Sequence, residues 1–423
     1  MPSSLTSRRA LLAGSAGVAA LLLAGCSSTD APTPTSTAPS ASTGTSADAG
    51  TSPSSGGASQ VDVTLTSASG ADACELSATS VPAGPVTFTV TNVDSAAISE
   101  FEIISDDRIV GEKENLAPGL QPVSFTVTLG GGDYQAYCPG AAEDTLDLTV
   151  TGEAAPTPTG GVQAVLTEGT TGYGTYVAGQ IEAMVEAVTN LQAAVDSGDL
   201  ESAKKAYATA RPFYEKVESD VEGFVLPGAD PTDNSGNLDY LIDMRASNLD
   251  EAVGWSGFHA VERDLFKSGK ITDGTKTYAA DLTANVTKLA ELAGGLTYKP
   301  EDLANGAAGL LEEVQANKIK GEEEKFSHLD LVDFAANVEG AEQAFAYLKP
   351  GLKEIDPDLT QTVAQRFDDV KTALKDYEDT SALGGYAAWT DALRKTDAAR
   401  LSQVIQALQT PLASIAEKVA TAK

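Results

Sequence analysis

The chain has 423 residues, of which 42% are hydrophobic, so it is long enough for two or three domains with packed cores. It carries 60 Asp and Glu against 28 Lys and Arg, a formal net charge of -32. This excess of negative charge repels nucleic-acid phosphates and anionic lipids and attracts cations, which excludes nucleic acid as a partner. Most of the carboxylates are expected to serve solubility, and only those with suitable spacing point to a site.

The N-terminus has the pattern of an export signal. Arg8 and Arg9 precede an apolar run over 11–23, which ends in Leu-Ala-Gly-Cys26, the pattern of a bacterial lipoprotein signal. The run is shorter than the roughly 20 residues of a membrane-spanning helix. We therefore expect residues 1–26 to be a signal peptide, with a lipid on Cys26 anchoring the protein to the extracytoplasmic face of the cell membrane. The paired arginines also resemble a twin-arginine signal, so either export route fits.

Two segments of contrasting composition follow. Residues 27–60 are almost entirely Ser, Thr, Ala, Pro, Gly and Asp, which predicts a disordered stalk. From 61 to 152 apolar residues alternate with polar ones and Gly/Pro turn signals separate the runs, which predicts a small antiparallel β-sandwich. The clearest strand patterns cover residues 61–65, 86–90, 125–129 and 146–150.

A Pro/Thr/Gly-rich linker over 153–162 leads to a region of helical periodicity, 163–423. Apolar residues recur there at steps of three and four, for example from Ile181 to Val195, which predicts an all-α domain. Further helices are expected at about 200–224, 249–266, 278–292, 302–316, 331–348, 359–377 and 392–418.

Three cysteines occur, and with Cys26 assigned to a lipid, Cys74 and Cys138 can pair only with each other. A single disulfide is therefore the simplest expectation. The predicted β-sandwich contains no His and no Met. A blue-copper site needs two His, a Cys and usually an axial Met, so type 1 copper is excluded.

The two histidines, His259 and His328, both lie in the helical region. Spacing of i,i+3 places His259 and Glu262 on one helix face, where they can grip one cation. A hydrogen-bonded histidine beside a solvated glutamate is the alternative.

The same spacing recurs in Glu215 with Glu218 and in Asp330 with Asp333, and carboxylates from separate helices can converge on one ion. One imidazole with several carboxylates suits iron, zinc or manganese. The run 322–324, three glutamates flanked by Lys320 and Lys325, is expected to be a solvated charge run.

These motifs together resemble a known family. The helical segments 211–218, 258–262 and 326–334 resemble the imelysin-like domain of EfeO iron-uptake lipoproteins. The segments 73–75, 100–104, 112–119 and 137–138 resemble, in the same order, the cupredoxin-like domain of that family. The resemblance covers the chain from Val61 to its end. It implies a cupredoxin-like β-sandwich followed by an all-α imelysin-like bundle.

The resemblance also implies a function. The protein would be the extracytoplasmic, membrane-anchored component that captures ferrous or ferric iron and passes it to an iron permease, with a haem peroxidase as a further partner. The implied metal ligands of the helical domain are His259, Glu262, Glu215 and Glu218, with Asp330 as an addition.

The implied second site, in the β domain, would bind copper or iron. Its ligands would be Cys74 and Cys138 with Glu100 or Glu102. A disulfide between the two cysteines is the alternative prediction, because cysteines joined in a disulfide offer no thiolate to a metal.

Three rival functions follow from the same residues. A metal-dependent peptidase needs three ligands, an open position and a general base, and the sequence has no His-Glu-x-x-His motif. Oxidation of ferrous iron would need a redox metal in the β domain, which has no histidine. Capture of an acidic polysaccharide would need a bridging divalent ion, because the net charge opposes direct binding of a polyanion.

Overall fold

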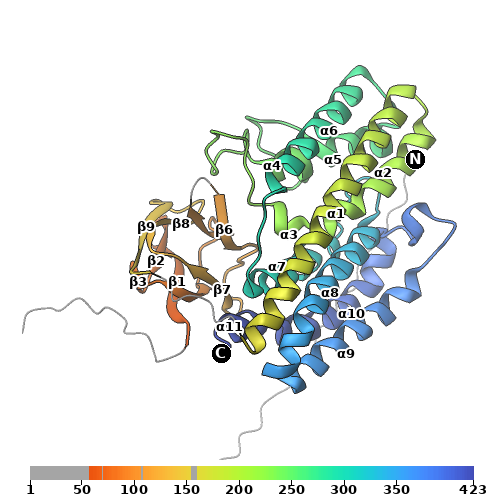
Figure 1. Ribbon diagram of the computed structural model, residues 1–423. Helices are drawn as coiled ribbons and strands as arrows, with labels where there is room; N and C mark the ends of the chain where they lie inside the picture. Colours follow the sequence, from red (N-terminus) through yellow and green to blue (C-terminus); the bar gives the residue numbers. More distant parts are fainter. Residues whose placement is uncertain (1–56, 69, 106–107, 154–159) are drawn as a thin grey trace, which may run out of the picture. The chain divides into compact units, whose positions relative to one another are not determined.

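The computed structural model describes residues 57–68, 70–105, 108–153 and 160–423 (Figure 1). All of them belong to one compact unit, 49–423. The predicted signal peptide, Cys26 and most of the predicted stalk lie outside the described residues. The last two stalk residues, Ser59 and Gln60, already belong to the first strand. In the described ranges, every helix is too short or too polar to cross a membrane.

The first part of the described chain consists of strands arranged in two sheets. One sheet has the order β2-β1-β4-β7 and the other the order β3-β9-β8-β5-β6. The strands are β1 (Ser59–Ala68), β2 (Ala71–Leu76), β3 (Ser80–Pro82), β4 (Gly84–Asn92), β5 (Phe101–Ser105), β6 (Arg108–Lys113), β7 (Val123–Leu129), β8 (Gly132–Tyr137) and β9 (Thr145–Thr151).

The side chains that alternate along these strands form the core between the sheets. Phe88 on β4 stacks on Phe125 on β7 with ring centroids 5.3 Å apart. The predicted sandwich is present, but two of its strand pairs are parallel: β1 with β4 and β3 with β9. A period of two shows which side chains face the core and does not show strand direction. The prediction that all strands are antiparallel was therefore wrong for these two pairs.

The second part of the described chain is helical. The α-helices are α1 (Val162–Ser197), α2 (Leu200–Glu215), α3 (Glu218–Val221), α4 (Leu238–Asp243), α5 (Gly257–Glu262), α6 (Asp273–Ala293), α7 (Pro300–Glu313), α8 (Asp330–Ile355), α9 (Pro357–Leu374), α10 (Asp391–Leu412) and α11 (Ile415–Ala420). Two π-helical turns, η1 (Arg263–Ser268) and η2 (Val314–Lys318), continue α5 and α7, and two short 3₁₀ turns are η3 (Lys375–Tyr377) and η4 (Leu383–Gly385). The 36-residue α1 packs against α2, α6 and α8 (Figure 1).

Three of the predicted helices are interrupted or shortened, and the one expected at 392–418 breaks at 413–414, between α10 and α11. The helix expected at 200–224 ends at Glu215, three residues after Pro212, and a helix resumes only at Glu218 with α3. The helix expected at 249–266 begins only at Gly257. The differences at 216–217 and 249–256 lie beside the buried charged residues described below.

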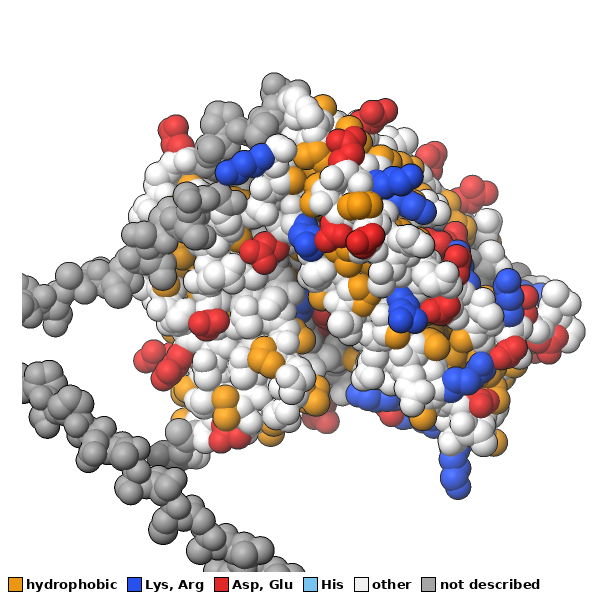
Figure 2. All heavy atoms as spheres, turned by 90° about the horizontal axis from the view of Figure 1, so that it is seen from below, with side chains coloured by type: hydrophobic (Ala, Val, Ile, Leu, Met, Phe, Trp, Pro, Cys, Tyr) orange, Lys and Arg blue, Asp and Glu red, His pale blue; other side chains and the backbone are white. Residues whose placement is uncertain are grey.

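The β-strands and the helices contact each other through polar groups. Lys113 on β6 donates to both carboxylate oxygens of Glu312 on α7, at 2.7 and 2.9 Å. Asn305 on α7 donates to the carbonyl oxygen of Thr126 on β7 at 2.7 Å. On the face shown in Figure 2, hydrophobic side chains occur in small groups between polar and charged ones. That face therefore has no broad apolar patch of the kind that marks a protein-binding surface.

Candidate metal centre

The position of α5 is fixed by a glycine that no other residue can replace without strain. Gly257 has a φ of 65°, in the left-handed region, and a Cβ placed on it would lie 2.0 Å from the carbonyl oxygen of Ile242 on α4. This close approach presses the start of α5 against the end of α4. It brings His259, two residues into α5, next to Asp243, the last residue of α4.

His259 is 1% exposed and has carboxylates at both ring nitrogens. Its Nδ1 lies 3.1 Å from Oε2 of Glu262, as the i,i+3 spacing predicts. Its Nε2 lies 3.4 Å from Oε1 of Glu323 and 3.6 Å from Oδ1 of Asp243. Two sets of potential ligands share the imidazole: Asp243, His259 and Glu323, and His259, Glu262 and Glu324, the atoms of each set lying within 4.8 Å of one another.

Glu262 is held rigidly. Its Oε1 accepts hydrogen bonds from the backbone amides of Phe326 and Ser327, at 2.6 and 2.7 Å. The side chain of Glu262 is completely buried, so the alternative prediction of a histidine beside a solvated glutamate was wrong. Because one oxygen is fixed by the 326–327 backbone, the other is directed at the imidazole.

The prediction for the run 322–324 was wrong for two of its three glutamates. Glu323 and Glu324 are both 0% exposed, while Glu322 pairs with the half-exposed Lys325. Glu324 accepts from Tyr207 Oη at 2.7 Å and also from Ser327 Oγ. The segment between η2 and α8 folds inwards at this point, and nothing in its local composition distinguishes the buried glutamates from the exposed one.

Two buried cations organise the remaining carboxylates. Arg211 on α2 pairs with Glu215 and Asp243, and it also contacts Glu323, Glu324 and Asp333 at 3.2–3.4 Å. Lys318, at the end of η2, is 1% exposed. Its Nζ lies 3.2 Å from Glu215, 3.5 Å from Glu218, 3.7 Å from Glu313 and 3.3 Å from Glu323.

The predicted ligands therefore lie in one buried network but in different places. Glu215 and Glu218 surround Lys318, whereas the carboxylates next to His259 are Glu262, Glu323 and Asp243. Asp330 begins α8, and its Oδ1 accepts from the backbone amide of Glu324 at 3.2 Å. The buried Oδ2 of Asp330 and Oδ1 of Asp333 have no hydrogen-bond partner.

Sequence reasoning missed Asp243, Arg211 and Lys318 as parts of this network. Asp243 stands in the apolar run Tyr-Leu-Ile-Asp-Met over 240–244, which is a weak signal of a buried acid. Lys318 stands in Asn-Lys-Ile-Lys over 317–320, where only the tertiary structure separates the buried lysine from the exposed one.

The network mixes charged and neutral acids. Burial alone would raise the pKa of Glu323. Lys318 and Arg245 nevertheless hold it well below its usual range, so this carboxylate is ionised. Burial raises the pKa of Asp243 to about 7 and that of Glu324 to about 8. Burial opposes protonation of His259, but hydrogen bonds to Glu262 and Glu323 raise its pKa well above its ordinary value. A metal at this imidazole must displace a proton.

The residues fit a hard or borderline divalent or trivalent cation. Buried carboxylates outnumber the two fully buried cations, and two acids of the network keep an unpaired oxygen. An imidazole nitrogen with several carboxylate oxygens is a donor set used by iron, zinc and manganese sites. The arrangement can hold an ion away from water.

The metal site predicted in the β domain lacks the two thiolate ligands that the resemblance implies. Cys74 and Cys138 are joined by a disulfide, so neither offers a thiolate to a metal here. This is one of the two alternatives that the sequence left open. Glu102 lies on β5 opposite Tyr137 on β8, and Glu100 lies two residues before it. Both acids line a cavity whose described lining residues do not include the two cysteines.

Comparisons with known proteins agree with the motifs. A family model described as Peptidase_M75, imelysin, matches residues 169–415. The "Iron uptake system component EfeO" of Escherichia coli is 33% identical over 366 residues, which cover 85% of this chain and 90% of that protein. The protein of the same name from Yersinia pestis is 34% identical over 355 residues, or 82% and 87% of the two chains.

A solved structure, a putative iron-regulated protein A precursor from Parabacteroides distasonis, covers 60% of this chain and 95% of its own. Its sequence identity to this chain is 15% and its TM-score 0.46.

Proposed function

Because the chain belongs to the EfeO family and carries an imelysin domain, we propose that it is the component of an iron-uptake system that captures ferrous or ferric iron outside the cytoplasm. One observation carries the proposal: a buried imidazole, His259, stands between two sets of carboxylates drawn from α4, α5 and the 323–324 segment. The iron ligands would be His259, Glu262 and Glu323, with Asp243 and Glu324 completing the two sets.

Glu215, Glu218 and Asp330 have a supporting role in this proposal. Nζ of Lys318 already lies against Glu215 and Glu218, and Asp330 holds the backbone of Glu324. We assign these three acids to the shell that fixes the ligands. Outer-shell residues of this kind orient ligands and tune metal affinity.

A binding role is favoured over catalysis by burial. His259, Glu262 and Glu323 are each at most 1% exposed. A hydrolytic metal centre keeps one position open to water and substrate. A closed centre suits holding an ion, so we do not assign peptidase activity to it.

The wider role follows from the family and from the N-terminal sequence. We propose that a lipid on Cys26 tethers the protein to the extracytoplasmic face of the membrane, and that the captured iron passes to a permease, with a haem peroxidase as a second partner. A tether of this kind raises the effective concentration of the donor near its membrane partner to roughly millimolar.

The test is a titration of purified protein with ferrous iron under anaerobic conditions and with a ferric chelate in air. The variant combining His259→Ala and Glu262→Gln should lose at least roughly tenfold in iron affinity, about 1.4 kcal/mol. His328→Asn is the matched control, because His328 is the other histidine and asparagine tolerates its φ of 61°. Thermal melts of each variant show whether it is folded. Affinity unchanged in a folded double variant would remove His259 from the site.

A further inference from the structure

A short segment, 321–328, lies between η2 and α8 and covers the candidate metal centre; we call it the strap. It contains only turns and bends. Glu323 and Glu324 point inwards and are 0% exposed, whereas Glu322 is half-exposed and Lys325 is exposed. Because neighbouring residues of the strap face the centre and the solvent, a single layer of chain separates the centre from water on this side.

Both sets of potential ligands depend on the strap. Glu323 completes the set of Asp243 and His259, and Glu324 completes the set of His259 and Glu262. The remaining members of the two sets belong to α4 and α5. An outward movement of the strap would remove one carboxylate from each set and open His259 to solvent. The position of the strap therefore decides both access to the centre and the number of its ligands.

The two ends of the strap are held by one buried residue, Trp389. Its Nε1 donates to the carbonyl oxygen of Ile319 at 3.1 Å, and its backbone amide donates to the carbonyl oxygen of His328 at 2.8 Å. Gly321 and His328, the end residues, have φ of 71° and 61°, and this left-handed conformation is uncommon for a histidine. Hinges are formed by a few such residues at the ends of a moving segment.

The middle of the strap is not part of any wider backbone network. Among the described residues, the backbone-to-backbone hydrogen bonds of 323–327 stay within the strap: the amide of Lys325 donates to Glu323 at 3.0 Å and the amide of His328 to Glu324 at 2.9 Å. The strap can therefore move outwards without breaking a helix or a sheet, as low-stability segments do.

Phe326 holds the outer side of the strap. Its ring centroid lies 6.1 Å from that of Trp255, and Nζ of Lys267 lies 4.8 Å from the centroid of the Phe326 ring. Phe326 and Trp255 are half-buried and Lys267 is exposed. An aromatic pair and a cation–π contact at such a site are individually weak, so they can break and re-form.

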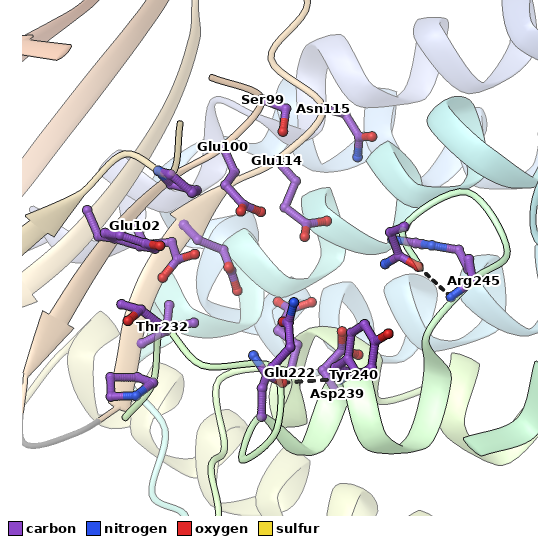
Figure 3. A pocket seen from close by; sticks show the side chains of 18 of the residues that line it. Ser99, Glu100, Glu102, Glu114, Asn115, Glu222, Thr232, Asp239, Tyr240 and Arg245 are labelled. Atoms are coloured by element: carbon purple, nitrogen blue, oxygen red, sulfur yellow. Dashed lines mark hydrogen bonds between the residues drawn. The ribbon is translucent and has the colours of Figure 1, made fainter. Parts of the chain in front are cut away.

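Glu323 can move outwards without leaving a buried cation unpaired. An unpaired buried charge is costly, but each of the three cations that contact Glu323 has another carboxylate partner. Arg245, which lines the neighbouring cavity shown in Figure 3, is one of the three. The cations and the partners that they keep are Arg245 with Glu313, Lys318 with Glu215, and Arg211 with Asp243.

We propose that the strap opens to admit the metal ion and closes on it, so that Glu323 and Glu324 join the ion after it has reached His259. The proposal rests on the proposed function of the centre. Phe326 is the positioning residue, because it holds the strap closed through Trp255 and Lys267 and does not touch the ion.

The first test follows release of ferrous iron from the full chain to excess ferrozine without oxygen. If opening of the strap limits release, the rate becomes independent of ferrozine concentration. Phe326→Ala should raise this limiting rate at least roughly tenfold, because both outer contacts are lost. Phe213→Ala is the matched control and should leave the rate unchanged: Phe213 is also half-buried, with Nζ of Lys216 5.9 Å from its ring centroid.

Hydrogen exchange is a second measurement and needs no iron. Phe326→Ala should speed amide exchange at 322–328 at least roughly tenfold and leave α8 and α9 unchanged. In the wild type, Mn²⁺ should slow exchange of the Phe326 and Ser327 amides, since a bound ion holds the strap closed.

The outcomes separate the strap from the centre. If iron binds but Phe326→Ala changes neither the release rate nor the exchange at 322–328, the strap is overturned and the centre stands. If the wild type binds no iron, the proposed function fails and exchange alone judges the strap. Faster exchange confined to 322–328 in Phe326→Ala would then support a hinged strap, and exchange altered throughout the protein, or nowhere, would overturn it.

Discussion

Oε1 of Glu323 lies 3.4 Å from Nε2 of His259, although Glu323 belongs to a run of three glutamates between two lysines. The glutamate before it pairs with Lys325 at the surface, whereas Glu323 contacts Arg211, Lys318 and Arg245. Adjacent residues of the same type thus have opposite environments. This contrast provides a test with a built-in control.

Glu323→Gln should lower iron affinity at least roughly tenfold, because it removes the ionised carboxylate at Nε2 of His259 while keeping the shape of the side chain. Glu322→Gln should leave the affinity unchanged, since its partner is a surface lysine. Equilibrium titration of both variants measures the difference. Equal effects would mean that burial of Glu323 has no bearing on metal binding.

Gly257→Ala should destabilise the protein by about 3 kcal/mol, since the new Cβ both adopts a left-handed conformation and meets the carbonyl oxygen of Ile242. Gly269→Ala separates the two causes: Gly269 has a φ of 61° but nothing within 4 Å of its Cβ position. Its cost should be about 1 kcal/mol. Chemical denaturation gives both values, and similar costs would contradict the proposed close contact of α4 with α5.

Lys318→Met should destabilise the protein by roughly 3–5 kcal/mol, because four carboxylates lose the buried ammonium that they surround. Added Mn²⁺ or Zn²⁺ should raise its melting temperature more than that of the wild type, since the ion replaces the lost charge. Lys320→Met, at an exposed position, should behave like the wild type. Calorimetric melts with and without metal check this, and a variant that metal does not rescue would argue against cation binding in the network.

A separate acid, Asp220, makes stability depend on pH. Burial raises its pKa to about 7, although the hydrogen bond from Tyr173 opposes the rise. The folded state therefore binds a proton that the unfolded state has released, so this group's contribution to stability falls as pH rises from about 4 to about 7.

Asp220→Asn keeps an acceptor for Tyr173 and should remove this part of the pH dependence. Relative to the wild type it should gain stability as pH rises from 5 to 8. Denaturant melts across that range measure the gain. Parallel curves for the two proteins would show that Asp220 does not titrate there.

The periodic patterns predicted the larger elements, because a helix or strand with one buried face has apolar residues at regular intervals in the sequence. The strands β2, β3, β5, β6 and β8 were not predicted, and the loop before α5 was predicted as helix. His259 with Glu262 was predicted from local spacing alone, since i,i+3 neighbours meet wherever the helix lies.

The partners from other elements were harder to predict. Glu323 and Asp243 reach His259 only through the fold: one lies on an irregular segment, and the other is brought in by the close approach of Gly257 to Ile242. Lys318 takes the place that the spacing of Glu215 and Glu218 suggested for a metal ion. A sequence pattern identifies groups able to bind a cation and does not show that a lysine already does so.

Anomalous diffraction can show whether iron binds beside His259. Crystals of the full chain grown anaerobically with ferrous iron would be measured above and below the iron absorption edge. We expect an iron peak about 2.0–2.2 Å from a ring nitrogen of His259, within reach of Glu262 or Glu323. Iron peaks elsewhere, with none beside this imidazole, would contradict it.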